Sequence, residues 1–91
     1  DEEEGTIIAI AELMCLLVLA AARGEEWRGR LVVYVTDNSN TESWLKRRVA
    51  KSRMARYALR LLQRMETTHC FRVFPAGIST HHNKKPKPTK T

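Results

Sequence analysis

The chain has 91 residues, enough for one small domain with a modest core, and its 43% of apolar residues is ordinary for a globular protein. The net charge of +6 is unevenly spread: residues 1–45 hold nine acids and three Lys or Arg, whereas residues 46–91 hold one acid and thirteen Lys or Arg. The basic second half favours a polyanionic partner, nucleic acid first. The wide separation of Cys15 and Cys70 excludes a zinc or redox motif, so we expect buried free thiols in an intracellular compartment, the cytoplasm or nucleus.

The first predicted element is a helix over about residues 6–23, apolar apart from Glu12 and ended near Gly24. The preceding acids are atypical of a signal peptide, and the run is short for a membrane span and contains a carboxylate. We therefore expect no membrane partner; the alternative is a membrane anchor formed by Ile7–Ala22. A carboxylate on such a helix needs a partner, a metal or water, unless Glu12 lies at a polar edge.

The second element is a strand over about residues 31–36, whose continuous β-branched run predicts burial on both faces. Asp37 comes directly after it, at the carboxyl end where open α/β sheets place ligands. This position suits a metal ligand or a base; the alternative is a turn aspartate that bonds its own backbone. Asn40 is expected to cap a short helix over about residues 41–48.

The short helix is expected to turn Trp44 and Leu45 inward. A basic segment begins at its end, with Lys46. Its candidate nucleic-acid-binding residues are Lys46, Arg47, Arg48, Lys51, Arg53 and Arg56. Because no acid interrupts them, phosphate binding is favoured over a solvated loop, although the flank of arginines that continues through Arg60 and Arg64 is also compatible with a solvated face.

The next helix is predicted over about residues 52–67, with a buried stripe at helical spacing formed by Met54, Ala58, Leu61, Leu62 and Met65. A second strand, about residues 71–75, turns Phe71 and Val73 inward. Helices 6–23 and 52–67 are expected to cover the two faces of the sheet. Residues 1–78 then form the domain, and residues 79–91 form a basic disordered tail.

Four segments within about residues 6–83 stand out together: Ala11-Glu12-Leu13, the strand end VVYVTDNSN, a short helix with tryptophan, and FRVF…GIST..N. Together they resemble the ribonuclease H-like domain that follows reverse transcriptase in retroelement polyproteins. The resemblance implies an α/β fold, here a partial ribonuclease H-like fold with two parallel strands joined by a right-handed helical crossover. It also implies hydrolysis of the RNA strand of an RNA–DNA hybrid by four carboxylates around two Mg²⁺ ions.

In that resemblance, Glu12 and Asp37 match two of the four catalytic, metal-binding carboxylates. The family's first aspartate lies on a hairpin strand before the helix, which this sequence lacks, and its last falls at Lys87, four residues after Asn83. The resemblance therefore implies weak Mg²⁺ binding and doubtful catalysis, because two cations need several anionic oxygens. The family's three antiparallel strands are also missing, so the rest of a polyprotein or a partner would supply them. The alternative is a small basic nucleic-acid-binding module without enzymatic activity.

Overall fold

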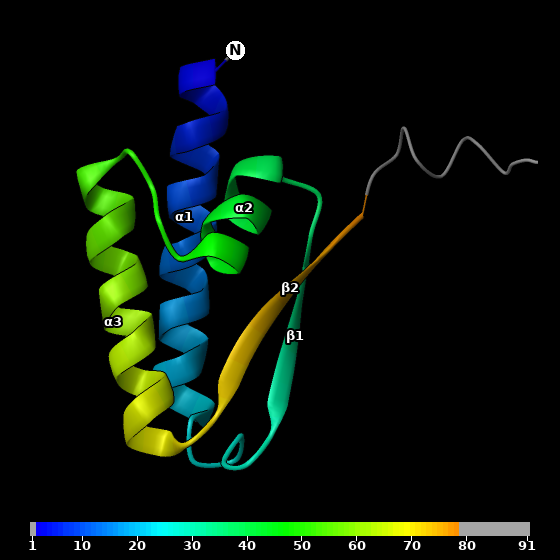
Figure 1. Ribbon diagram of the computed structural model, residues 1–91, viewed down its shortest axis with the longest axis vertical. Coiled ribbons are helices and arrows are strands. Elements are labelled where there is room, and N and C mark those ends of the chain that lie inside the picture. Colours follow the sequence, from blue (N-terminus) through cyan, green and yellow to red (C-terminus); the bar gives the residue numbers. More distant parts are fainter. Residues whose placement is uncertain (1, 79–91) are drawn as a thin grey trace, which may run out of the picture.

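The computed structural model describes residues 2–78, which form three helices and a sheet of two parallel strands (Figure 1). In chain order the elements are α1 (Glu2–Arg23), β1 (Leu31–Thr36), α2 (Ser39–Arg47), α3 (Arg53–His69) and β2 (Arg72–Gly77). The predicted α/β class and the parallel pair of strands are confirmed. The predictions for the tail, including Asn83 and Lys87, fall outside the described residues.

The two faces of the sheet differ, and this corrects one expectation. The helices lie together on one side of the strands (Figure 1). The residues of β1 that face them, such as Val32 and Tyr34, are partly buried, whereas Leu31, Val33 and Val35 on the opposite face are each more than half exposed. The prediction that α1 and α3 cover opposite faces is wrong, because these helices pack against each other instead.

The core lies between α1, α3 and the inner face of the sheet. Small residues allow the two long helices to approach closely, and Ala9, Ala20, Ala55 and Ala58 are almost completely buried. Leucines of both helices fill the centre. They are joined by Trp44 and Leu45 from α2, Val73 from β2 and Phe71 just before β2, the inward residues predicted from the sequence. Trp27 closes one end with its ring edge-on to Phe71, at a centroid distance of 5.3 Å.

The buried stripe of α3 is displaced from the predicted one. Met54 is 56% exposed, and the buried positions are Ala55, Ala58, Leu59 and Leu62. The close contact with α1 explains the shift, because two alanines at the interface let the backbones approach where methionine would hold them apart. Leu61 and Met65 are half-buried at the edge of this contact.

The ends of α2 and α3 are fixed by side chains and by two residues in the left-handed region. Asn38, not the predicted Asn40, caps α2: its side-chain oxygen accepts hydrogen bonds from the backbone N–H groups of Asn40 and Thr41. Ser52 caps α3 in the same way. Arg48 ends α2 with φ +62°, and Cys70 ends α3 with φ +61°.

Much of α1 is apolar and exposed. Its segment Glu4–Arg23 is long and apolar enough to cross a membrane, although its inner side forms part of the core. Ile7, Ile8, Val18 and Leu19 lie on the outer side. Cys15 is exposed on this helix and Cys70 is exposed after α3, so both thiols are free but not buried as expected.

Candidate nucleic-acid interface and carboxylate pair

Glu12 lies beside the carboxyl end of β1, where three hydroxyl groups hold it. The Thr41 hydroxyl donates to Oε1 at 2.6 Å, and the Thr36 hydroxyl lies 2.9 Å from Oε1 and 3.2 Å from Oε2. The Tyr34 hydroxyl is the third group that hydrogen-bonds the same carboxylate. Both threonines are almost fully buried, so these hydroxyls fix the position of the carboxylate.

The pKa of the Tyr34 phenol is sensitive to its contact with the Glu12 carboxylate. Burial raises the pKa of Tyr34 above its ordinary value of 10.0, and the negative charges of Glu12 and Cys15 raise it further, as does the hydrogen bond to Glu12. The protonated phenol is thus the form that donates to Glu12. Glu12 has the partner that its apolar helix requires, and that partner is a set of hydroxyls.

Asp37 follows Thr36 directly, so the two predicted carboxylates lie at the same end of β1. Among residues 4–78 the Asp37 side chain, which is exposed, has no hydrogen-bond or ion-pair partner. Thr36 links the two positions, because it binds Glu12 and its hydroxyl also accepts the N–H of Asn38 at 3.0 Å. The side chain that bonds the backbone of this turn is therefore that of Asn38, which accepts the N–H of Asn40, and not that of Asp37.

These residues do not fit a two-Mg²⁺ centre. Across the described part of the chain no three side chains of the metal-binding types Asp, Glu, His or Cys gather at one place. The Glu12 oxygens also accept hydrogen bonds from neutral hydroxyls, which occupy part of their capacity for a cation. Glu12 and Asp37 thus lie at the same end of β1, and no third side chain of the metal-binding types completes a cluster with them among the described residues.

Arg48 lies apart from the other predicted nucleic-acid-binding residues. Its guanidinium forms a two-point hydrogen-bonded ion pair with Glu66, at 2.8 and 3.0 Å, and the two side chains are 15% and 5% exposed. It also donates to the backbone oxygens of Leu45 and Val73 at 2.7 Å. With four hydrogen bonds of its guanidinium made inside the fold, Arg48 has a structural role.

Glu66 completes this network. Burial alone would raise the pKa of Glu66, but hydrogen bonds from Arg48 and from the Val73 N–H, with the positive charges of Arg48 and Arg72, lower it below its ordinary value of 4.5. The carboxylate is therefore ionised at neutral pH, as its partner requires. The outward backbone groups of Val73 are both bonded: the N–H to Glu66 and the carbonyl to Arg48.

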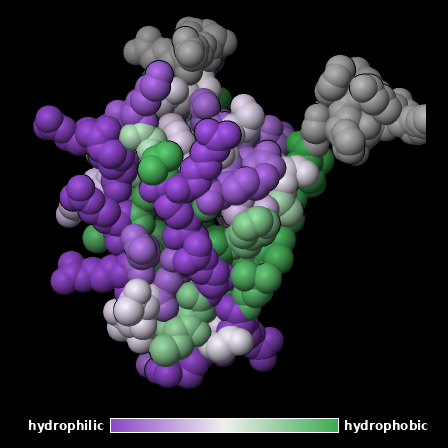
Figure 2. All heavy atoms as spheres, viewed as in Figure 1, coloured by the Kyte–Doolittle hydropathy of each residue, from purple (hydrophilic) through white to green (hydrophobic). Residues whose placement is uncertain are grey.

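The other predicted cations remain on the surface. Lys46 lies 3.8 Å from Glu42 in an exposed i,i+4 pair, and Arg56 donates to the backbone oxygens of Ala50 and Lys51. Arg47, Lys51 and Arg53 have no acidic partner within residues 4–78. Figure 2 shows polar side chains over α3 and apolar ones along the strands. Five of the six predicted residues are thus exposed, and Lys46 is the one of these five that has an acidic partner among the described residues.

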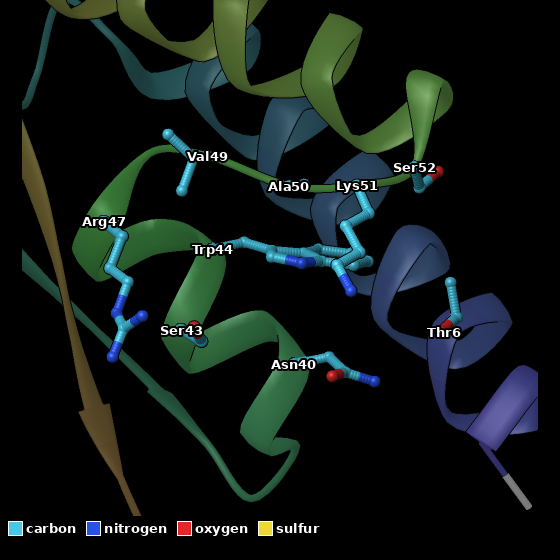
Figure 3. Close-up of a pocket in the computed structure, with 9 residues that line it drawn as sticks. All are labelled: Thr6, Asn40, Ser43, Trp44, Arg47, Val49, Ala50, Lys51 and Ser52. Carbon is cyan, nitrogen blue, oxygen red and sulfur yellow. The ribbon is translucent and has the colours of Figure 1, made fainter.

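A hollow of about 580 Å³ opens between α2, the α2–α3 connection and the start of α1 (Figure 3). Trp44 lines the hollow from α2, and Arg47 and Lys51 contribute two positively charged side chains to its lining. The rest of the lining is formed by the polar side chains of Thr6, Asn40, Ser43 and Ser52 and by the apolar residues Val49 and Ala50. Two cations over neutral polar groups make this hollow suitable for an anion.

Smaller hollows continue the basic surface along α3. Arg53, Arg56 and Arg60 recur at helical spacing and line one of them together with Tyr57, which is exposed. Arg56 and Arg60 also line the next, towards Val49. We call the surface formed by Arg47, Lys51, Arg53, Arg56, Arg60 and Arg64 the basic surface.

Sequence reasoning missed the residues that hold the charges in place. Thr36 and Thr41 carry no signal beyond proximity to Asp37, and Glu66 could have been noticed as the only acid among residues 46–91. A single acid in so basic a segment indicates a specific ion pair.

No family model, no curated protein and no solved structure matches this chain.

Proposed function

We propose that this chain is a nucleic-acid-binding, ribonuclease H-like fragment of a retroelement reverse transcriptase, which binds an RNA–DNA hybrid or duplex through its basic surface. The observation that carries the binding proposal is the row of exposed arginines along α3, which have no acidic partner among the described residues and are continued by Arg47 and Lys51. An arginine row of this kind suits the phosphate backbone, which supplies most of the sequence-independent affinity for nucleic acid.

The family part of the proposal rests on order and placement. The element order of helix, strand, two helices and parallel strand agrees with the segments that carry the resemblance. Glu12 and Asp37, matched to two of the family's carboxylates, lie together at the carboxyl end of β1. The alternative is a basic binding module without enzymatic activity. It would account for the basic surface but not for the placement of Glu12 and Asp37.

Catalysis by this chain is not part of the proposal. Two carboxylates, one of them held by hydroxyls, are too few to bind two Mg²⁺ ions and orient an attacking water. A binding role without turnover is what the described residues support.

A charge-reversal pair tests the binding proposal. Arg53→Glu with Arg60→Glu alters the basic surface, and Arg23→Glu with Arg28→Glu makes the same change in net charge elsewhere. We expect the first pair to weaken binding of a short labelled RNA–DNA hybrid by at least about tenfold and the second to change it far less. Equal losses would show that only net charge matters, and unchanged affinity in both would refute the basic surface as a binding site. Fluorescence anisotropy at fixed salt gives the affinities.

A further inference from the structure

The two edges of the sheet differ: the outer edge of β2 is blocked, whereas the outer edge of β1 is open. On β2, the backbone groups of Val73, Pro75 and Gly77 point away from β1, because the residues between them bond β1. The N–H and carbonyl of Val73 are bonded by Glu66 and Arg48, Pro75 has no N–H, and the Glu42 side chain lies against Gly77. This edge cannot accept another strand.

The outer edge of β1 is open along its whole length. Arg72 donates to the Arg30 carbonyl and Ile78 to the Thr36 carbonyl, so the even-numbered residues of β1 bond β2. The N–H and carbonyl groups of Leu31, Val33 and Val35 therefore point outward, and no group of the described residues bonds them. Their side chains, on the open face of the sheet, carry no charge that would repel a second strand.

We infer that the partner of this edge is a second copy of the chain, paired antiparallel through β1 about a two-fold axis at Val33. In that register Val33 lies opposite its own copy, and Leu31 lies opposite Val35 of the copy. All three residues carry outward backbone groups, so the pairing forms six hydrogen bonds with no mismatch. The result is a four-stranded sheet whose two outer edges are the blocked β2 edges.

Charge complementarity at the ends of β1 selects the antiparallel arrangement. Arg28 and Arg30 precede the strand and Asp37 follows it, and all three are exposed. In the two-fold register the end of β1 that carries Asp37 meets the start of β1 of the copy, which follows Arg28 and Arg30. Each end of the pair thus brings one acid against two cations, whereas a parallel pairing brings like charges together.

Sedimentation at micromolar concentration tests whether the chain dimerises through the β1 edge. The parent chain is compared with the variants Val33→Pro and Phe74→Lys. Val33→Pro removes an outward N–H without touching a β1–β2 hydrogen bond, as Pro75 already does on the other edge. Phe74→Lys is the control: it places a charge on the same open face of the sheet, but on β2 and not on the β1 edge. We expect a dimer for the parent chain and for Phe74→Lys, and a monomer with unchanged helical circular dichroism for Val33→Pro. A monomeric parent refutes the proposal, and dissociation by Phe74→Lys but not by Val33→Pro assigns the contact to the face instead.

Disulfide trapping tests the register and needs no disruptive substitution. In a chain with Cys15→Ser and Cys70→Ser, Val33→Cys places two cysteines opposite each other, about 5.5 Å apart at Cα and within disulfide range. Val35→Cys is the matched control, because its copies are displaced by four residues, about 13 Å. We expect mild oxidation to link Val33→Cys into dimers much faster than Val35→Cys. Equal rates, or a faster reaction of Val35→Cys, would overturn the two-fold register at Val33.

Discussion

Arg48 and Glu66 bond each other and both bond Val73: the guanidinium donates to the Val73 carbonyl, and the carboxylate accepts the Val73 N–H, each at 2.7 Å. Two side chains on different helices thus occupy the place of a neighbouring strand. The left-handed backbone at Arg48 makes this possible, because it turns the chain back as α2 ends.

The first prediction concerns the stability of this pair. Arg48→Ala and Glu66→Ala should each lower the free energy of unfolding by about 3–5 kcal/mol, because each leaves a buried partner charge uncompensated. Arg23→Ala, which breaks the exposed pair with Glu26, should cost at most about 1 kcal/mol. Urea unfolding followed by circular dichroism measures all three. A cost at Glu66 no larger than the Arg23 control would contradict the assigned role.

The second prediction is a loss of stability in acid through Glu66. Its pKa in the folded chain lies below the ordinary value of 4.5, so its stabilising contribution is fully present above that pH and is lost as the pH falls through the folded pKa. The parent should therefore lose more stability below pH 4.5 than Glu66→Gln does. Urea midpoints over this range give the comparison, and parallel curves would exclude the carboxylate as the titrating group.

The third prediction uses Tyr34 as a probe of Glu12. In a Tyr57→Phe background Tyr34 is the one remaining tyrosine. Its pKa should lie above 10.0 and should fall, but not completely to 10.0, on Glu12→Gln, because burial is the largest cause and persists. Ultraviolet absorbance of tyrosinate during an alkaline titration measures it. No shift on Glu12→Gln would mean that the phenol does not sense this carboxylate.

The fourth prediction concerns salt. If the basic surface contacts phosphates, the logarithm of duplex affinity should fall linearly with the logarithm of salt concentration. Arg53→Ala should reduce the steepness by about 1, as expected for the loss of one phosphate contact. Arg28→Ala, outside the basic surface, should leave the slope unchanged. A slope near zero for the parent chain would remove the electrostatic basis of the proposal.

The fifth prediction is an absence of turnover. The chain with Mg²⁺ should not cleave an RNA–DNA hybrid above background, because no three side chains of the metal-binding types gather at one place among the described residues. Gel analysis of a labelled RNA strand detects cleavage. Robust cleavage that Asp37→Asn abolishes would show that the two carboxylates suffice.

Periodic and apolar patterns predicted the elements well. The continuous run at Leu31–Thr36 gave a strand with the observed bounds, and Phe71 and Val73 face inward as expected. The same run misled about burial, because β-branched residues on an uncovered face look the same in sequence as residues beneath a helix. Which side of a sheet a helix covers depends on its contacts with other helices, and α1 and α3 meet through alanines that carry little signal.

The candidate site could be predicted only in part. Asp37 and Glu12 were identified from their setting, a strand end and an apolar helix, and both lie where that setting implied. The hydroxyls that hold Glu12 and the separation of Arg48 from the other cations depend on long-range contacts. Nothing local in the sequence distinguishes Arg48 from Arg47, since the difference arises from a left-handed turn and from Glu66, on another helix.

The parallel pairing of β1 and β2 also constrains the order in which the chain folds. Leu31 pairs with Arg72, so formation of the sheet must close a long loop, and the entropic cost of that closure is smaller once α2 and α3 have shortened the distance between its ends. Helical turns form within microseconds or less and need only local contacts. The network of Arg48, Glu66 and Val73 joins α2, α3 and β2, so it becomes complete only as β2 docks. Until that step β1 exposes both of its edges, and the arrival of β2 decides which edge stays free.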